Sequence, residues 1–132
     1  MTTIYLAGPI NGCTDDEASG WRKKFMEMLP NGKYKFLDPM RRDFRGKEDE
    51  SVDEIVWGDL ADIDNSDVFL AYCWQPSWGT AMEIHYAYAQ TEHPLSVVLV
   101  VPEGSRISPW LRYHSDHIVS TLEDAAGVIA RQ

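Results

Sequence analysis

The fold is decided by residues 67–87, which read DVFLAYCWQPSWGTAMEIHYA. The apolar first part predicts a buried strand from Asp67 to Trp74, and the part after the loop predicts a helix from Trp78 to Gln90. A single carboxylate, that of Glu83, lies in the first turns of this otherwise apolar helix. Proteins built from alternating strands and helices place reacting groups behind such loops, so Glu83 is a candidate functional residue.

The same alternation continues on both sides of this segment. Strand-like runs lie at Ile4–Ala7, Tyr34–Leu37, Leu95–Val101 and, more weakly, His117–Val119. Helices are expected from Thr14 to Leu29, from Ser51 to Ile63 and from Leu122 to Arg131. The sequence therefore predicts an α/β fold, a doubly wound, Rossmann/flavodoxin-like parallel sheet of about five strands with helices on both faces.

Local signals mark the starts and the inner faces of the helices. Thr14 with Glu17, and Ser51 with Glu54, each match the pattern of a capping box. The expected apolar faces consist of Trp21, Phe25, Met26 and Leu29 in the first helix, and of Val52, Ile55, Val56, Leu60 and Ile63 in the second. The segment from Met40 to Glu50 is charged and aperiodic, which predicts a surface loop long enough to be functional.

Length and composition limit the possible classes of protein. The 132 residues, 44% of them hydrophobic, suit one compact domain spanning residues 1–132. The chain enters its first strand without a basic and apolar leader and has no apolar stretch near ~18 residues, so we expect a cytoplasmic protein without a membrane partner. Cys13 and Cys73 lack metal-type spacing and are interpreted as small buried residues, without a metal site or a disulfide.

The charge of the chain is strongly acidic and is concentrated in one segment. The formal net charge is -9, which argues against a nucleic-acid polymer as partner because phosphate binding needs a basic surface. Nine acidic residues and no Lys or Arg lie between Glu48 and Asp67. Most of these acids fit a solvated helix face and a loop.

One acid of this run, Asp59, is expected to face the core. Helical periodicity places it within the apolar stripe of the second helix, where an unpaired charge is costly. The interpretation is open between a polar site with a shifted pKa and a position at the edge of the sheet, where Asp59 reaches solvent or pairs with Arg41 or Arg42.

Glu83 also has two interpretations. Thr80 and Glu83 fit a capping box if the helix starts there, but a start at Ser77 would remove that role. Two carboxylates directed into one cleft suit glycosidic-bond chemistry, with one as nucleophile and the other assisting the leaving group. Tyr5 is either an orienting hydrogen-bond donor for such a carboxylate or a core aromatic residue. His85 and His114 have no partner at catalytic spacing and are interpreted as structural or surface residues.

Ordered motifs along the chain resemble the nucleoside 2-deoxyribosyltransferase superfamily, which includes the 2'-deoxynucleoside 5'-phosphate N-hydrolases. The matching pieces are Ile4–Ile10, Asp38-Pro39, Gly58-Asp59-Leu60, Asn65–Val68, Gly79–Ala87 and Ser108-Pro109-Trp110. The resemblance implies that Glu83 is the nucleophile at C1' of the deoxyribose, that Asp59 moves a proton to the departing base, and that Tyr5 holds the Glu83 carboxylate. It implies that substrate is bound by Gly8, Pro9, Ile10, Asp38, Ser77, Gly79, Met82 and Ser108.

The resemblance further implies a small-molecule nucleoside or nucleotide and a free nucleobase as partners, no cofactor, and a homodimer or larger homo-oligomer in which a neighbour completes the pocket. Transferases acting on free nucleosides often carry an acid six residues before the nucleophile, where this chain has Ser77. The phosphate-recognising hydrolases carry a serine there, but they also place a serine and an arginine where this chain has Pro9 and Asn11. We therefore expect a nucleoside 2-deoxyribosyltransferase, with a nucleoside 5'-monophosphate N-glycosidase or a nucleotide-binding module as alternatives.

Overall fold

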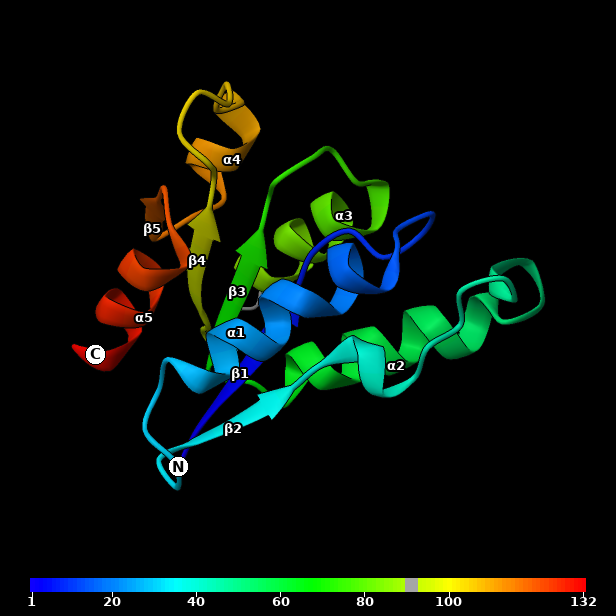
Figure 1. Cartoon of the computed structure of the whole chain (residues 1–132), viewed down its shortest axis with the longest axis horizontal. Coiled ribbons are helices and arrows are strands. Elements are labelled where there is room, and N and C mark those ends of the chain that lie inside the picture. The colour runs from blue at the N-terminus through cyan, green and yellow to red at the C-terminus, as the bar shows by residue number, and fades with distance from the viewer. Residues whose placement is uncertain (90–92) are drawn as a thin grey trace.

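The computed structural model describes residues 1–89 and 93–132 and contains one parallel sheet. The strands are β1 (Thr2–Ala7), β2 (Tyr34–Leu37), β3 (Val68–Tyr72), β4 (Ser96–Val100) and β5 (His117–Val119). Their order across the sheet is β2-β1-β3-β4-β5, and every neighbouring pair is parallel (Figure 1). This is the flavodoxin-like order, with its switch point between β1 and β3. The predicted α/β fold is confirmed.

Helices cover both faces of the sheet. α1 (Trp21–Glu27) and α5 (Leu122–Ala130) pack on the face formed by Ile4 and Leu6 of β1. α2 (Val52–Asp64) and α3 (Trp78–Tyr88) pack on the opposite face, formed by Tyr5 and Ala7. Successive residues of a strand point to opposite faces, so β1 contributes to both cores.

The first helix follows the prediction closely at its start. The amide of Thr14 donates to Glu17 Oε1 at 2.9 Å and the amide of Glu17 donates to Thr14 Oγ1 at 3.2 Å, so the predicted capping box is formed. A π-helical segment, Asp16–Gly20, precedes α1. Trp21, Phe25 and Leu29 are buried against the sheet, as their spacing predicts.

The predicted apolar face of α2 is wrong in its first half. Val52 and Val56 are 57% and 47% exposed, whereas Ile63 is fully buried. The first turns of α2 extend beyond the edge of the sheet, and only the last turns lie over it (Figure 1). The predicted Ser51 capping box is also absent, because a preceding 3-10 turn (Glu48–Glu50) gives Ser51 a φ of -126° and a ψ of 25° instead of an extended backbone.

Three short helical elements were not predicted from the sequence. The expected loop from Met40 to Glu50 contains the 3-10 helix Glu48–Glu50, and another, Pro39–Arg41, overlaps its start. The short helix α4 (Pro109–Tyr113) follows the loop after β4, with Ser108 as its N-cap. The expected end of α3 at Gln90 lies outside the described residues. None of the helices within residues 1–89 and 93–132 combines the length and apolar character needed to span a bilayer.

Candidate functional site

The centre of the candidate site is a hydrogen bond between β1 and α3. The hydroxyl of Tyr5 donates to Glu83 Oε2 at 2.5 Å. The Tyr5 side chain is fully buried and its ring stacks on Phe69, with the centroids 5.6 Å apart. Packing of the ring therefore fixes the hydroxyl that holds the carboxylate.

The start of α3 decides between the two interpretations of Glu83. Ser77 is the N-cap, and its hydroxyl accepts from the amide of Thr80 at 3.3 Å. Glu83 consequently lies in the second turn, too far along the helix for the reciprocal bond of a capping box. The Thr80–Glu83 capping box is therefore wrong, and the carboxylate is directed to Tyr5 instead.

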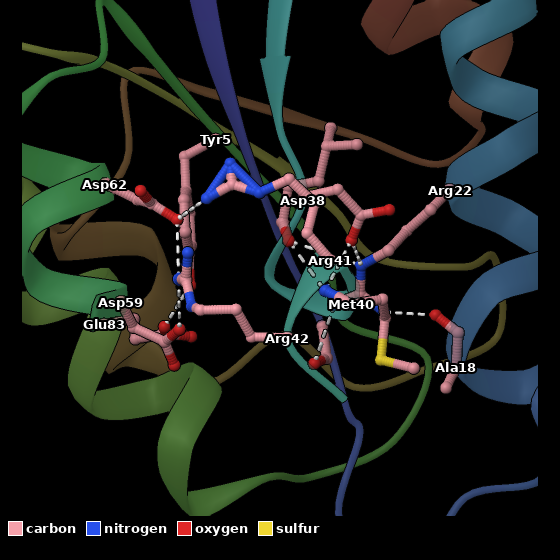
Figure 2. A network of polar contacts seen from close by, with 12 residues as sticks. Tyr5, Ala18, Arg22, Asp38, Met40, Arg41, Arg42, Asp59, Asp62 and Glu83 are labelled. Carbon is pink, nitrogen blue, oxygen red and sulfur yellow. Dashed lines mark hydrogen bonds and ion pairs between the residues drawn. The ribbon is translucent and has the colours of Figure 1, made fainter. Parts of the chain in front are cut away.

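Asp59 lies beside Glu83, on the last turns of α2. The two carboxyl groups interact with each other, and each acts on the pKa of the other. Asp59 Oδ1 also lies 3.6 Å from Nη2 of Arg42, and the Asp59 side chain is 22% exposed (Figure 2). Asp59 therefore combines two of the interpretations that the sequence leaves open, because it faces Glu83 and also pairs with an arginine.

The environment raises the affinity of this carboxyl pair for protons. Burial, followed by the neighbouring Asp59, raises the pKa of Glu83 to about 8, while the hydroxyl of Tyr5 acts in the opposite direction. Burial also raises the pKa of Asp59 above its usual value, against the effect of Arg42. Burial, together with Glu83, raises the pKa of Tyr5, which therefore remains a donor. Two coupled carboxyls of this kind share one proton near neutral pH, as an acid and nucleophile pair requires.

A buried arginine that the sequence analysis missed holds the loops beside this cluster. Arg22 is fully buried, donates to the carbonyls of Leu6, Gly8 and Ala18, and lies 3.4 Å from Asp38 Oδ1. It thus joins the carboxyl ends of β1 and β2 (Figure 2). The sequence did contain one signal for this burial, because Arg22 directly follows Trp21, a residue predicted to lie on the inner side of the first helix.

The first loop and Asp38 are held by this arrangement. A Cβ at Gly8 would lie 2.7 Å from Cζ2 of Trp21, so only glycine fits there. Pro9 is buried and Ile10 half-buried. The carboxylate of Asp38 accepts from the amide of Met40 at 2.9 Å and pairs with Arg22, so its contacts are structural ones.

Two of the other predicted binding residues lie in a cavity that the carboxyl pair does not line. Ser77 and Ser108 border a cavity of about 660 Å³ between the loops that follow β3 and β4. Its wall also contains Trp74, Trp78, Arg106 and Trp110, and the described residues lining it do not include Tyr5, Asp59 or Glu83. Gly79 and Met82 are exposed, the latter by 68%.

The two histidines that were interpreted as unpartnered contact each other. His85 Nδ1 lies 2.9 Å from His114 Nε2, and His114 Nδ1 lies 2.7 Å from the carbonyl of Trp110. A carbonyl only accepts, so His114 carries its proton on Nδ1 and His85 donates to its Nε2 when both rings are neutral. The pair joins α3 to α4, which agrees with a structural role. Within residues 1–89 and 93–132, no cluster of three or more His, Cys, Asp or Glu side chains is arranged to hold a metal ion.

Comparison with known proteins found one family model that covers nearly the whole chain. The family model described as nucleoside 2-deoxyribosyltransferase matches residues 4–127. No curated protein sequence matches the chain significantly.

Solved structures share the fold at low sequence identity. The 2-deoxyribosyltransferase of Bacillus psychrosaccharolyticus superimposes with a TM-score of 0.73 at 18% identity, over 95% of this chain and 90% of that one. The 2-deoxyribosyltransferase of Leishmania mexicana gives 0.65 at 19% identity, over 100% and 99%. The CMP N-glycosidase of Clostridium botulinum gives 0.59 at 18% identity, over 98% and 99%.

Proposed function

The chain belongs to the nucleoside 2-deoxyribosyltransferase family, and from this premise we propose that it cleaves the N-glycosidic bond of a 2'-deoxyribonucleoside and transfers the deoxyribose to another nucleobase. The observation that carries the proposal is the Tyr5–Glu83–Asp59 cluster. It lies beside the β1/β3 switch point, where sheets of this kind bind ligands.

In the proposed mechanism, the proton that the carboxyl pair shares passes from Glu83 to Asp59, and the Glu83 carboxylate then attacks C1' while the bond from C1' to the base nitrogen breaks. Asp59 gives its proton to that nitrogen, so the base leaves in neutral form and the charge remains on Asp59. The hydroxyl of Tyr5 orients the Glu83 carboxylate for the attack. In the second half, an incoming base attacks C1' of the glycosyl ester, Asp59 takes the proton from its nitrogen, and Glu83 leaves. Two inversions give net retention.

A second enzymatic candidate is a nucleoside 5'-monophosphate N-glycosidase, with water as acceptor. Ser77 favours it, because a neutral side chain six residues before Glu83 does not repel a phosphate as an acid would. Pro9 and Asn11 stand against it, since neither supplies a charged partner.

Incubation with deoxyinosine or its 5'-phosphate, with and without free adenine, separates the two enzymes. A new nucleoside that appears only with adenine supports transfer, and free base without an exchange product supports hydrolysis. A binding module would bind the ligand equally well before and after Glu83→Ala and show no turnover in either case.

We also propose that the functional unit is a homo-oligomer in which a second copy completes the pocket. Large apolar side chains are exposed beside the Ser77 and Ser108 cavity, with Trp78 at 87%, Trp110 at 75% and Tyr113 at 71% exposed. Exposed large apolar side chains that lie together mark interaction surfaces. Light scattering coupled to size-exclusion chromatography tests it: Trp110→Ser should shift the mass towards the monomer, and a monomeric parent would contradict the proposal.

A further inference from the structure

We propose that Arg42 is a positioning residue for the glycosidic-bond chemistry, acting as the counter-ion that stabilises the Asp59 carboxylate left behind when its proton moves to the departing base. The inference rests on the proposed function, in which Asp59 is the acid. The bond from Asp59 oxygen to hydrogen breaks, the bond from hydrogen to the base nitrogen forms, and the negative charge left on Asp59 faces Arg42.

The position of Arg42 is defined by two acids of α2. Its Nη2 lies 2.8 Å from Asp62 Oδ2 and 3.6 Å from Asp59 Oδ1. Asp59 and Asp62 are three residues apart on a helix, so their side chains lie on one face, and a single guanidinium can span them. Asp62 fixes the guanidinium, and the remaining contact is directed to Asp59 (Figure 2).

Gly58 allows this close approach. A Cβ there would lie 3.2 Å from Nε of Arg42 and 3.3 Å from both Cζ and Nη2. Three atoms of the guanidinium at nearly equal distance show that the group lies flat along α2, at the residue before Asp59. A side chain at this position would displace the guanidinium by a few tenths of an ångström.

The charges around Asp62 do not balance, and the excess is positive. Asp62 Oδ2 also accepts from Arg41 Nη2 at 2.7 Å, so two arginines meet one carboxylate there. Two positive charges against one negative charge leave a net charge of one facing Asp59. Of the two arginines, Arg42 is the one paired with Asp59 as well, which makes Arg41 a matched control.

A neutral hydroxyl and another arginine act on the same carboxyl pair. Tyr5 from β1 and Arg22 from α1 interact with Glu83, and Arg22 pairs with Asp38 from the loop after β2. Tyr5 and Arg22 stabilise charge on Glu83, while Arg42 stabilises charge on Asp59. The two carboxyls therefore each have their own stabilising group, as required if charge passes from one to the other during the reaction.

The first experiment needs no substrate. Carboxyl carbon NMR titrations of the parent, Arg42→Met and Arg41→Met would follow Asp59 and Glu83, with Arg42→Lys as the charge-conserving variant. Loss of an opposite charge from a partly buried pair should raise the Asp59 pKa by roughly 0.5 to 1 unit in Arg42→Met, and by less than half as much in Arg41→Met. Arg42→Lys should restore part of the difference. Equal shifts in the two Met variants would overturn the proposal.

The second experiment uses leaving groups that differ in their need for a proton. Deoxyinosine needs protonation of its base, whereas 4-nitrophenyl 2-deoxyriboside releases an anion that is stable without one. Arg42→Met should lower kcat about tenfold on deoxyinosine and less than about twofold on the nitrophenyl substrate. Equal losses on both substrates would indicate a structural role and contradict the inference. If the parent turns over neither substrate, the proposed function fails, and the NMR titration still decides the assignment of Arg42.

Discussion

Replacing Glu83 by glutamine should remove activity and, at the same time, stabilise the protein at neutral and alkaline pH. The pKa of Glu83 in the folded chain is raised from 4.5 to about 8, chiefly by burial. Between these two values the folded state binds a proton that the unfolded chain has released. The free energy of unfolding therefore falls as pH rises from about 4.5 to about 8. Glutamine has no proton to lose, so Glu83→Gln lacks this decline.

The size of the effect follows from the pKa difference. A shift from 4.5 to about 8 corresponds at most to about 5 kcal/mol, at 1.36 kcal/mol per pKa unit. Asp59 shares the proton, which lowers the expected effect to about half, whereas the weaker hydrogen bond of an amide with Tyr5 costs about 1 kcal/mol at every pH and cancels in the comparison. We therefore expect Glu83→Gln to gain about 2–3 kcal/mol over the parent at pH 8.5, relative to the difference at pH 4.5.

Urea unfolding at several pH values, followed by circular dichroism, measures this difference directly. Glu54→Gln is the control, because Glu54 is an exposed acid near the start of α2. The control keeps Glu83, so it should follow the parent to within about 0.5 kcal/mol at every pH. If Glu83→Gln parallels the parent at every pH, or loses stability relative to the parent as pH rises, then Glu83 does not hold a proton in the folded state at neutral pH.

Three further substitutions test the surroundings of Glu83. Tyr5→Phe keeps the buried ring and removes the 2.5 Å hydrogen bond, so kcat should fall about 10- to 100-fold and the acidic limb of the pH profile should move to higher pH, as steady-state kinetics would show. Asp59→Asn should lower kcat on deoxyinosine by at least about 100-fold while the melting temperature changes by less than about 4 °C; the reverse pattern would favour a structural ion pair. Arg22→Met leaves Asp38 and three carbonyls without their buried partner, and should cost about 3 kcal/mol in urea unfolding; a neutral result would contradict its bracing role.

The limits of sequence reasoning are visible in α2. Helical periodicity correctly predicted that Asp59 faces inward, but it wrongly predicted that Val52 and Val56 are buried. A periodic pattern reports which side of a helix faces inward and contains no information on how far the sheet beneath it extends. The strands were more predictable, because apolar runs such as Val97–Val100 are buried on both faces and need no knowledge of neighbouring elements.

Side chains whose partners are backbone atoms were the hardest to predict. The role of Arg22 depends on carbonyls of Leu6 and Gly8, which carry no signal in the sequence. The His85–His114 contact likewise depends on α4, a helix of five residues that is too short to show a period. Both are products of the tertiary arrangement.

The grouping of Tyr5, Asp59 and Glu83 follows from the order of the strands. Asp59 lies on α2, which precedes β3, and Glu83 lies on α3, which follows it. Both helices pack on the same face of the sheet. Alternation along β1 turns Tyr5, but neither Ile4 nor Leu6, towards that face. Because β1 is the neighbour of β3, the tyrosine hydroxyl reaches the Glu83 carboxylate. Moving Tyr5 by one position along β1 would place it in the opposite core, so the candidate chemistry depends on the register of β1 as much as on the acids themselves.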